Sequence, residues 1–476
     1  MTDIETSSLG KVHFIAIGGA VMHNLAIALQ SKGYAVSGSD DEFFEPSRSR
    51  LAARGLLPAE PGWHPERITP DLQAVILGMH ATEDNPELVR ARQLGLKIYS
   101  FPDYLYEQTA REKRIVVGGS HGKTTTTAMI MHVLRHAGME FDYMVGAQVE
   151  GFDTMVGLSH TAKVAVFEGD EYLTSPLDRT SKFLHYHPDV AVITGIAWDH
   201  VNVFPTFDGY VDQFRKFAHS VMPGGSLIYC HADERLRSIA AEAYPQGVKV
   251  LPYDGFKWRV GDADAVLATI DGQDVRVAVF GDHNMQNMNA ALLACREVGV
   301  TDKQFAEAIA SFDGAARRLQ ELCRAADGSV AYLDFAHSPS KLRATINAVR
   351  GRYPGRRIVA CMELHTFSSL TRDFLPQYAG TMDAADEAIV YFNPEVIAHK
   401  RLAQFSPADV EAAFAHKGLA VFTRPQDVVA RLEASDLCGA VLLLMTSGNF
   451  GGLDLKALAS RLLGHAPCGQ ITRSQQ

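Results

Sequence analysis

A glycine-rich segment between an apolar run and a helix-compatible run constrains the fold of this chain more than any other feature. Residues 114–127 read RIVVGGSHGKTTTT, with a β-type run at 115–117 before the glycines and a helix-compatible run at 128–134 after them. Strand, glycine loop and helix in this order form a phosphate-binding loop, in which backbone N–H groups and the positive end of the helix dipole hold phosphate oxygens. The segment therefore predicts an α/β domain that binds a nucleoside triphosphate.

Two residues of this loop have specific expected roles. Lys123 is expected to reach the β- and γ-phosphates, and the Thr124 hydroxyl is a candidate ligand of Mg²⁺. The motif is shorter than the general pattern, because Val117 stands where a glycine is expected. The alternative is a glycine turn that only caps a helix, but the strand before it and the helix after it favour nucleotide binding. The residues predicted to bind the nucleotide here are Gly119, Ser120, His121, Gly122, Lys123, Thr124 and Thr125.

Composition excludes several classes of protein. The 476 residues carry 45 basic and 55 acidic side chains, a net charge of −10, which disfavours a general nucleic-acid binder. The six cysteines are scattered without a Cys-x-x-Cys pair, so we expect reduced thiols and no zinc site. No signal peptide is visible in residues 1–11, and the apolar runs are too short to insert into a membrane. A cytoplasmic protein is expected.

Strand-like and helix-compatible segments alternate along most of the chain, which is typical of α/β proteins with parallel, doubly wound sheets. Three domains are expected, over residues 1–110, 111–316 and 317–476. The first has strands near 12–17, 35–38, 74–78 and 97–99. A hairpin is predicted over 265–280, turning at Asp271-Gly272. In the first domain, Gly18, Gly19 and Ala20 form a turn after the first strand, which either approaches a ligand or is simply tight.

Charged side chains follow two strands of the central domain. Glu168 ends the run 164–167, and Asp199-His200 follows the run 190–194. Ligands of open α/β sheets gather at the carboxyl ends of the strands, so a carboxylate and an imidazole there, with the Thr124 hydroxyl, are candidate Mg²⁺ ligands. A solvated loop acid and a polar strand-end histidine are equally good interpretations of Glu168 and His200.

Other polar residues stand near expected element ends. Asn284 and Asn287 lie at the start of an alanine-rich helix, where they either cap it or reach an adenine edge. Arg318 follows the second domain boundary, where it either meets a phosphate or is solvated. Asp334 and His337 follow a strand, and Ser39-Asp40 end the second strand of the first domain, a common place for a ribose or base contact.

Six motifs in this order resemble the Mur ligase family, whose members are ATP-dependent amide ligases that build bacterial cell-wall precursors. They are the phosphate loop, Glu168, Asp199-His200, residues 281–287 (GDHNMQN), Arg317-Arg318 and residues 334–339 (DFAHSP). The resemblance covers nearly the whole chain. It implies ATP and Mg²⁺ as cofactors, with Lys123, His200 and Arg318 catalytic, Thr124, Glu168 and His200 holding metal, and Asn284, Asn287, Arg318 and Asp334 contacting the nucleotide.

Residues 15–22 and 84–87 are similar to the branch of this family that accepts UDP-N-acetylmuramate on a Rossmann-like first domain. The resemblance also implies a central P-loop ATPase-type sheet and a Rossmann-like C-terminal domain that binds the acceptor and part of the nucleotide. Residues implied to line the UDP-sugar site are Gly18, Gly19, Ala20, Ser39 and Asp40. Many members carry a carbamylated lysine after the metal histidine, and the equivalent position here is Phe214.

Two acceptors occur in this branch: L-alanine, and the tripeptide L-alanyl-γ-D-glutamyl-meso-diaminopimelate of cell-wall recycling. Residues 178–186 (DRTSKFLHY) and 447–452 (SGNFGG) resemble the tripeptide-adding enzymes. Residues 363–369 lack both arginines of the acceptor segment of the alanine-adding enzymes. The tripeptide is therefore the expected acceptor and L-alanine the alternative, with His337, His365 and Asn449 as candidate acceptor-site residues.

The resemblance implies that ATP converts the sugar carboxylate to an acyl phosphate, which the amine of the acceptor then attacks. Two rivals from other classes remain: a P-loop NTPase that hydrolyses ATP without ligation, and a nucleotide-sugar binding protein without catalysis. Folate-polyglutamate and cyanophycin enzymes share the loop but do not open with this Gly18-Gly19 domain. The sequence indicates no oligomeric state.

Overall fold

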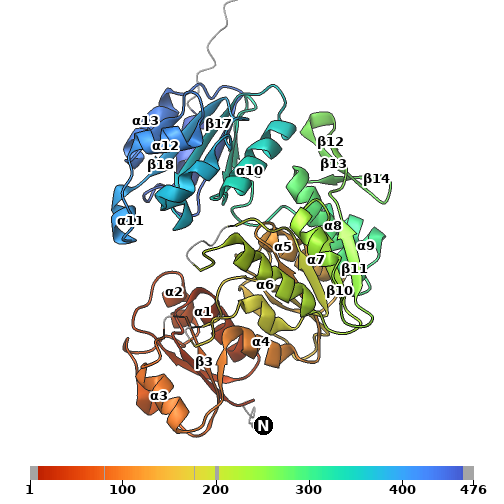
Figure 1. The fold of residues 1–476 in the computed structure, drawn as a ribbon, viewed down its shortest axis with the longest axis vertical. Coiled ribbons are helices and arrows are strands. Elements are labelled where there is room, and N and C mark those ends of the chain that lie inside the picture. Colours follow the sequence, from red (N-terminus) through yellow and green to blue (C-terminus); the bar gives the residue numbers. More distant parts are fainter. Residues whose placement is uncertain (1–8, 80, 176, 199–202, 465–476) are drawn as a thin grey trace, which may run out of the picture. The chain divides into compact units, whose positions relative to one another are not determined.

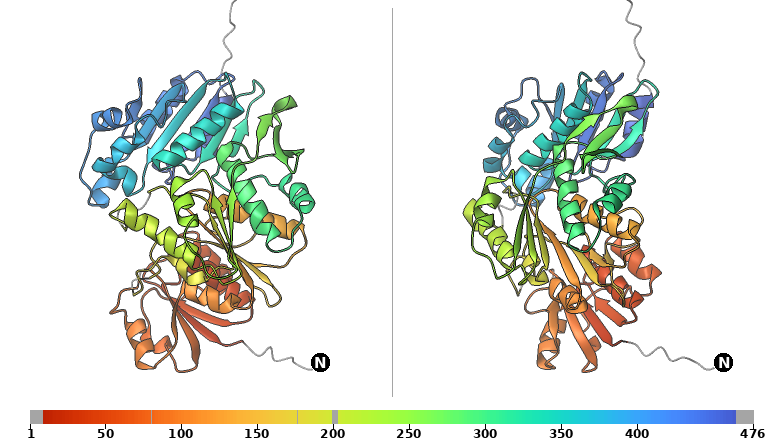
Figure 2. Two further views of the ribbon diagram at one scale, coloured as in Figure 1. Left: turned by 45° about the vertical axis from the view of Figure 1, so that its right-hand side comes forward. Right: turned by 90° about the vertical axis from the view of Figure 1, so that its right-hand side faces the viewer.

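The computed structural model describes residues 9–79, 81–175, 177–198 and 203–464. By its internal contacts the chain divides into two compact units (Figure 1; Figure 2). Of the described residues, those within 1–196, 206–254 and 286–309 form the first unit, and those within 197–205, 255–285 and 310–476 form the second. Within the described residues, no helix is long and apolar enough to cross a bilayer.

The first unit begins with a four-stranded sheet in the order β2-β1-β3-β4, in which all neighbours are parallel. The strands are β1 (Lys11–Ile15), β2 (Ala35–Ser39), β3 (Leu72–Leu77) and β4 (Ile98–Ser100), close to the four predicted ranges. The helices between and after them are α1 (Ala20–Ser31), α2 (Ser47–Ala53), α3 (Pro86–Gln93) and α4 (Phe101–Thr109), and a short 3₁₀ helix, η1, spans Pro65–Arg67. Buried side chains from β1, β3 and α3 form its core.

A second sheet of the first unit carries the phosphate loop. Its seven strands run in the order β11-β10-β9-β5-β8-β6-β7, and every neighbouring pair except β6-β7 is parallel. The strands are β5 (Lys113–Gly118), β6 (Asp142–Met144), β7 (Val156–Gly157), β8 (Val164–Glu168), β9 (Val190–Ile193), β10 (Ser226–Cys230) and β11 (Lys249–Tyr253). The associated helices are α5 (Lys123–His136), η2 (Lys182–Tyr186), α6 (Phe207–His219), α7 (Glu234–Ala240) and α9 (Asp302–Ile309), while α8 (Asp282–Arg296) has residues in both units.

The second unit contains a small antiparallel sheet of β12 (Trp258–Val260), β13 (Val266–Ile270) and β14 (Gln273–Val277), next to η3 (Asp262–Asp264). It confirms the predicted hairpin. Asp271 and Gly272 at its turn have φ values of 48° and 75°, as a two-residue hairpin loop requires.

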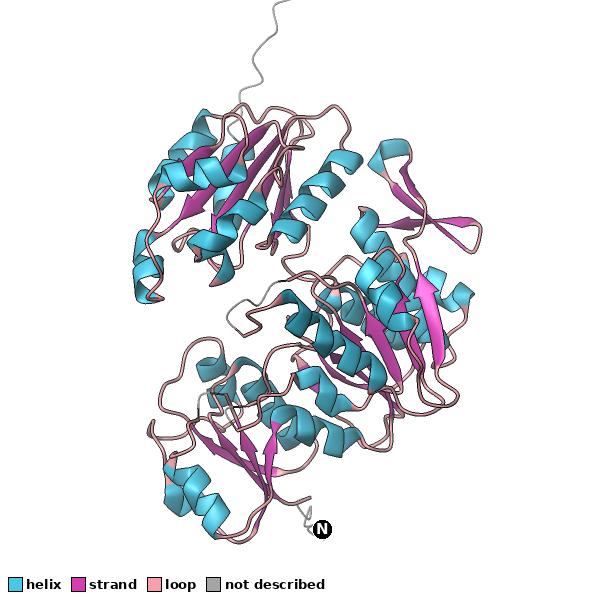
Figure 3. Cartoon of the chain, in the orientation of Figure 1, coloured by secondary structure: helices cyan, strands magenta, loops and turns pink. Residues whose placement is uncertain are grey.

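The large sheet of the second unit has six strands in the order β15-β16-β20-β17-β18-β19, parallel except for β15-β16. The strands are β15 (Gln320–Arg324), β16 (Val330–Asp334), β17 (Ile358–Leu364), β18 (Glu387–Phe392), β19 (Ala420–Phe422) and β20 (Val441–Met445), and from β16 onward helices lie between successive strands along the chain (Figure 3). Those helices are α10 (Pro339–Arg352), η4 (Ser368–Leu370), η5 (Arg372–Tyr378), α11 (Pro394–His399), α12 (Pro407–Phe414), α13 (Pro425–Ala434) and α14 (Leu455–Gly464). The α/β class with parallel-rich sheets is confirmed.

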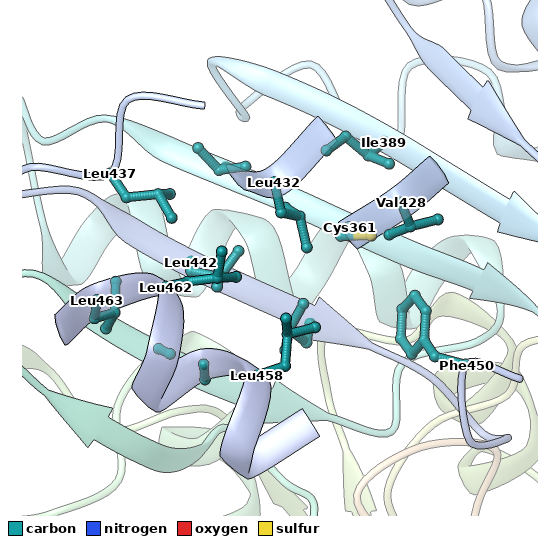
Figure 4. Packing of buried hydrophobic residues seen from close by; sticks show 14 of the residues in the cluster. Cys361, Ile389, Val428, Leu432, Leu437, Leu442, Phe450, Leu458, Leu462 and Leu463 are labelled. Atoms are coloured by element: carbon teal, nitrogen blue, oxygen red, sulfur yellow. The ribbon is translucent and has the colours of Figure 1, made fainter. Parts of the chain in front are cut away.

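The apolar core of the second unit fixes the ends of its central strands. Val428 and Leu432 of α13, with Leu458 of α14, pack against side chains of β17, β18 and β20 (Figure 4). Cys361 and Leu442 belong to this cluster and are fully buried. Because buried strands cannot shift without opening cavities, the loops at their carboxyl ends start from fixed positions.

The expectation of reduced thiols is confirmed in part. Cys230, Cys295, Cys323 and Cys361 are free. Cys438 is instead disulfide-bonded, so the expectation is wrong for that residue.

Candidate active site

Two glycines of the phosphate loop have conformations that only glycine adopts readily. Gly119 has φ of 135° and Gly122 has φ of 74°. A Cβ on Gly119 would overlap the Thr194 side chain, and a Cβ on Gly122 would overlap Asn287 Oδ1. The loop is thus closely packed on both sides, and α5 starts directly after it at Lys123. Gly122 offers that helix no side-chain cap, so the first-turn N–H groups suit an anion.

The end of β9 holds the loop from the other side. Ser120 N donates to Gly195 O across 2.9 Å. Thr194 Oγ1 lies 3.2 Å from Gly118 O and also donates to His121 O. These contacts fix the loop backbone before any nucleotide binds, which reduces the ordering cost of binding.

Lys123 is held at the mouth of the loop by two acceptors. Its Nζ donates to Gly119 O at 2.6 Å and forms an ion pair with Glu171 Oε2 at 2.9 Å. Burial alone would lower the pKa of Lys123, but the carboxylates of Glu171, Asp170 and Glu168 outweigh it and raise the pKa. Lys123 therefore stays a cation, as contact with phosphate oxygens requires.

Thr124 and Glu168, two of the candidate metal ligands, are in direct contact. Thr124 Oγ1 donates to Glu168 Oε1 at 2.8 Å, and Gly146 N donates to Glu168 Oε2 at 2.6 Å. Residue pairing places Glu168 opposite Val117, so the end of β8 is next to the end of β5. His200 lies outside the described residues, and within those residues no group of three His, Cys, Asp or Glu side chains could hold a metal. A hydroxyl and a carboxylate in contact are a donor pair that fits Mg²⁺.

The two asparagines of α8 have different surroundings. Asn287 is buried beside Gly122, so the structure brings it to the phosphate loop. Asn284 is also buried, and its Nδ2 donates to Phe280 O at 2.9 Å. This bond anchors the first turn of α8.

The glycine turn after β1 contacts the end of β2. Gly18 N donates to Asp40 Oδ2 at 2.7 Å, and a Cβ on Gly18 would lie 2.8 Å from the same oxygen. Burial raises the pKa of Asp40 to about 6, although the bond from Gly18 N opposes this shift. Ser39 is fully buried, and Gly19 precedes α1, which starts at Ala20. The predicted UDP-sugar residues are therefore neighbours.

In the second unit, Asp334 ends β16 and is engaged by donors of its own unit. It accepts hydrogen bonds from Leu319 N at 2.7 Å, Ala336 N at 2.8 Å and Thr345 Oγ1 at 3.1 Å. The guanidinium carbon of Arg318 lies 4.6 Å from the ring centroid of Phe335. Asp334 and Arg318 are thus at one end of the sheet, where cation–π contact orients the arginine.

Two of the candidate acceptor residues lie near a buried carboxylate. Glu363, at the end of β17, accepts hydrogen bonds from Phe450 N at 2.9 Å and from the Thr446 hydroxyl. His365 Nδ1 is 3.7 Å from Glu363 Oε1. Asn449 precedes Phe450, so His365 and Asn449 flank this carboxylate. His337 bonds instead to Phe335 O at 2.8 Å through Nδ1.

Two residues of the site were not predicted. Glu171 pairs with Lys123, and Tyr210 on α6 donates to Glu171 Oε1 at 2.9 Å. Glu171 stands three residues after Glu168. This spacing indicates an acidic loop but does not predict which residue Glu171 pairs with. Tyr210 has no motif around it, because only the packing of α6 brings it to the loop.

Models of three domains of one family match most of the chain. The Mur ligase middle domain matches residues 117–295, a domain described as "Mur ligase family, catalytic domain" matches residues 11–113, and the "Mur ligase, glutamate ligase domain" matches residues 317–448. Two relatives are similar over nearly their whole length. A UDP-N-acetylmuramate–L-alanine ligase of Mycolicibacterium vanbaalenii is 31% identical over 96% of this chain and 97% of its own. The UDP-N-acetylmuramate–L-alanyl-gamma-D-glutamyl-meso-2,6-diaminoheptandioate ligase of Escherichia coli K12 is 29% identical over 94% and 97%.

Solved structures share the fold at lower identity. The UDP-N-acetylmuramate-alanine ligase MurC from Thermotoga maritima superposes with a TM-score of 0.68 at 20% identity, covering 96% of this chain and 98% of that one. A murein peptide ligase from Psychrobacter arcticus gives a TM-score of 0.62 at 22% identity, with the same coverage.

Proposed function

We propose that this chain, which belongs to the Mur ligase family, joins UDP-N-acetylmuramate to the tripeptide L-alanyl-γ-D-glutamyl-meso-diaminopimelate. The chain is an ATP-dependent acid–amino acid ligase of this family. The observation that carries the ligase chemistry is the contact of Thr124 with Glu168 beside Lys123, which gathers a hydroxyl, a carboxylate and a cation at one loop. ATP and UDP-linked substrates would place the reaction in the cytoplasm.

In the first proposed step the sugar carboxylate attacks the γ-phosphate of ATP and gives an acyl phosphate and ADP. Lys123 holds the β- and γ-phosphates and offsets the charge that develops during transfer. Gly119, Ser120, His121, Gly122 and Thr125 would surround the phosphates with the N–H groups of the loop and of the first turn of α5.

Thr124 and Glu168 would hold one Mg²⁺, and His200 with Glu168 a second. The ions supply charge neutralisation between two anionic reactants. Within this chain, Gly146 N and the Thr124 hydroxyl each donate a hydrogen bond to one oxygen of Glu168, which orients its carboxylate.

The remaining assignments follow the family motifs. Asn284 and Asn287 would contact adenine, Arg318 a phosphate, and Asp334 the ribose. Gly18, Gly19, Ala20, Ser39 and Asp40 would bind the UDP-sugar.

In the second step the amine of the acceptor attacks the acyl phosphate and phosphate leaves. Thr194 and Asn287 pack against the backbone of the loop that would hold the triphosphate.

The choice of acceptor rests on local features. Residues 363–369 lack both arginines expected for L-alanine, and Glu363 of this segment is buried and accepts a hydrogen bond from Phe450 N at 2.9 Å. Residues 178–186 make two ion pairs. Lys182 pairs with Asp170 of the acidic loop after β8 at 2.6 Å, and His185 pairs with Asp103 of α4 at 2.7 Å. The second candidate is an L-alanine ligase, the name of more of the similar relatives.

One assay separates the candidates. The protein is incubated with ATP, Mg²⁺ and UDP-N-acetylmuramate, and phosphate release is measured with either L-alanine or the tripeptide. Release with the tripeptide at a kcat/KM well above that with L-alanine supports the proposal. Release with L-alanine alone rejects the tripeptide, and ATP hydrolysis that does not depend on UDP-N-acetylmuramate rejects ligation.

A further inference from the structure

A closed ring of hydrogen bonds surrounds Lys123. Lys123 Nζ donates to Gly119 O at 2.6 Å and to Glu171 Oε2 at 2.9 Å. The other oxygen, Glu171 Oε1, accepts a bond from Tyr210 Oη at 2.9 Å. Tyr210 Oη is also 2.9 Å from Ser120 Oγ. The ring returns to the loop through the Gly119–Ser120 peptide.

The direction of each bond in the ring follows from the number of protons. A phenol has one O–H, which Tyr210 gives to Glu171, so Ser120 must be the donor in its contact with Tyr210. An ammonium has three N–H donors, and among the described residues two of those of Lys123 have acceptors. The third is available to a phosphate oxygen while the first two remain bonded.

Glu171 itself is 1% exposed, so its charge has to be compensated locally. Lys123 supplies the opposite charge and Tyr210 a hydrogen bond, which together satisfy both carboxylate oxygens. Because both of its oxygens are bonded, the Glu171 carboxylate cannot move towards solvent together with the Lys123 side chain. It therefore restrains the four-carbon stem of Lys123, whose many rotamers would otherwise have to be ordered on nucleotide binding.

The face of α6 that meets the loop is otherwise aromatic. Phe214, at the position where many family members have a carbamylated lysine, packs on Tyr210 and Phe183 at centroid distances of 5.2 and 5.6 Å. Phe217 fills the space beside Gly118, where a Cβ would lie 2.9 Å from its ring. Tyr210, one helical turn before Phe214, thus points its hydroxyl from this aromatic face of α6 towards the phosphate loop.

We propose that Glu171, oriented by Tyr210, is a positioning residue that holds the Lys123 ammonium in its phosphate-binding place before ATP arrives. The proposal rests on the proposed function for the role of Lys123. Charge and direction both matter: Glu171 attracts the ammonium, and Tyr210 keeps the carboxylate from rotating away. The other carboxylates acting on Lys123 are Asp170 and Glu168, and Asp170 is already paired with Lys182.

The test compares Tyr210→Phe and Glu171→Gln with the wild type. Tyr253→Phe is the matched control, because Tyr253 is a buried tyrosine of the same unit whose hydroxyl has no hydrogen-bond partner among the described residues. Mg²⁺–ATP binding is measured by calorimetry, which needs no ligation, and kcat and KM for ATP are measured with the acceptor that the wild type uses. UDP-N-acetylmuramate binding reports on the fold.

We expect Tyr210→Phe and Glu171→Gln each to weaken ATP binding and to lower kcat/KM for ATP about tenfold or more, the size of a bond to a charged group. Binding of UDP-N-acetylmuramate stays within twofold of wild type, as does every property of Tyr253→Phe. The double variant loses no more than Glu171→Gln alone, since both act through one carboxylate. Glu171→Asp restores part of the lost affinity.

Three outcomes would overturn the proposal. One is ATP affinity within twofold of wild type in Glu171→Gln. Another is an additive loss in the double variant. The third is a parallel loss of ATP and UDP-sugar binding, which would indicate a structural role. A wild type that binds ATP but does not ligate would reject the proposed function alone, because the calorimetric comparison remains valid.

Discussion

The Thr124 hydroxyl and the Glu168 carboxylate, 44 residues apart in the sequence, are joined by a 2.8 Å hydrogen bond. The bond links the first turn of α5 to the last residue of β8. It follows directly from the parallel pairing of β5 and β8, which places Glu168 opposite Val117.

Thr124→Ala should therefore lower kcat on the order of a hundredfold and raise the Mg²⁺ concentration needed for half-maximal rate, because a proposed metal ligand is lost. Thr127→Val is the matched control, since the Thr127 hydroxyl on the same helix is buried and finds no hydrogen-bond partner in the part of the chain that the structure describes. The measurement is a Mg²⁺ titration of phosphate release. Equal Mg²⁺ dependence in both variants would contradict the assignment.

Lys123→Ala should abolish turnover, with a loss of roughly a thousandfold, because the γ-phosphate loses its cation. Binding of UDP-N-acetylmuramate should remain, since the turn at Gly18 is stabilised by Asp40 and not by the phosphate loop. Lys216→Ala, which removes an exposed lysine of α6, is the control. If Lys123→Ala still ligates, Lys123 is not required for phosphoryl transfer and the assigned role is wrong.

Gly122→Ala and Gly138→Ala separate backbone strain from a specific contact. Both glycines have similar positive φ, 74° and 70°, so each variant should lose about 1–2 kcal/mol of stability. A Cβ on Gly122 would displace the Asn287 amide, whereas nothing lies within 4 Å of one on Gly138. We expect only Gly122→Ala to raise KM for ATP, by about tenfold. A similar rise in Gly138→Ala would mean that strain alone is responsible.

The pair formed by the partly exposed Glu112 and the buried Asp142 predicts a pH dependence of stability. Burial, and then the charge and hydrogen bond of Asp142, raise the pKa of Glu112 to about 8. Between its unfolded pKa near 4.5 and 8 the folded state keeps a proton that the unfolded state has lost, so stability falls as pH rises through this window and then levels off.

Glu112→Gln should remove this dependence, because an amide hydrogen-bonds to Asp142 without needing a proton. At pH 8.5 the variant should be more stable than wild type by on the order of 1 kcal/mol, after allowance for solvent screening, and the gain should shrink towards pH 5. Urea unfolding at the two pH values measures it, with Glu60→Gln on the exposed surface as control. A gain that is independent of pH would contradict the explanation.

Local sequence patterns were sufficient for much of this architecture. The β5–loop–α5 segment, the strands after it and the hairpin at Asp271 each have a short-range signal: an apolar run, a glycine or a turn pair. The start of α5 was placed too late, because four β-branched threonines weaken a helix prediction, whereas the loop and the packing of α5 establish the helix from Lys123.

The surroundings of Lys123 could not be predicted in the same way. Its partner Glu171 is on another strand end, and Tyr210 is on a helix whose approach depends on Phe183, Phe214 and Phe217 packing together. No sequence pattern within a few residues of Tyr210 predicts its contact with Glu171. The contact of Asn287 with Gly122 likewise depends on the tertiary position of α8.

The side-by-side ends of β5 and β8 also limit how this chain can change in length. Side chains alternate between the two faces of a strand, so one residue inserted within β8 would turn Glu168 to the opposite face and leave Thr124 facing an apolar neighbour. The same insertion in the exposed turn at residues 160–161 leaves the pairing untouched. Natural variants of this enzyme should thus gain or lose residues freely at that turn and almost never within the strand.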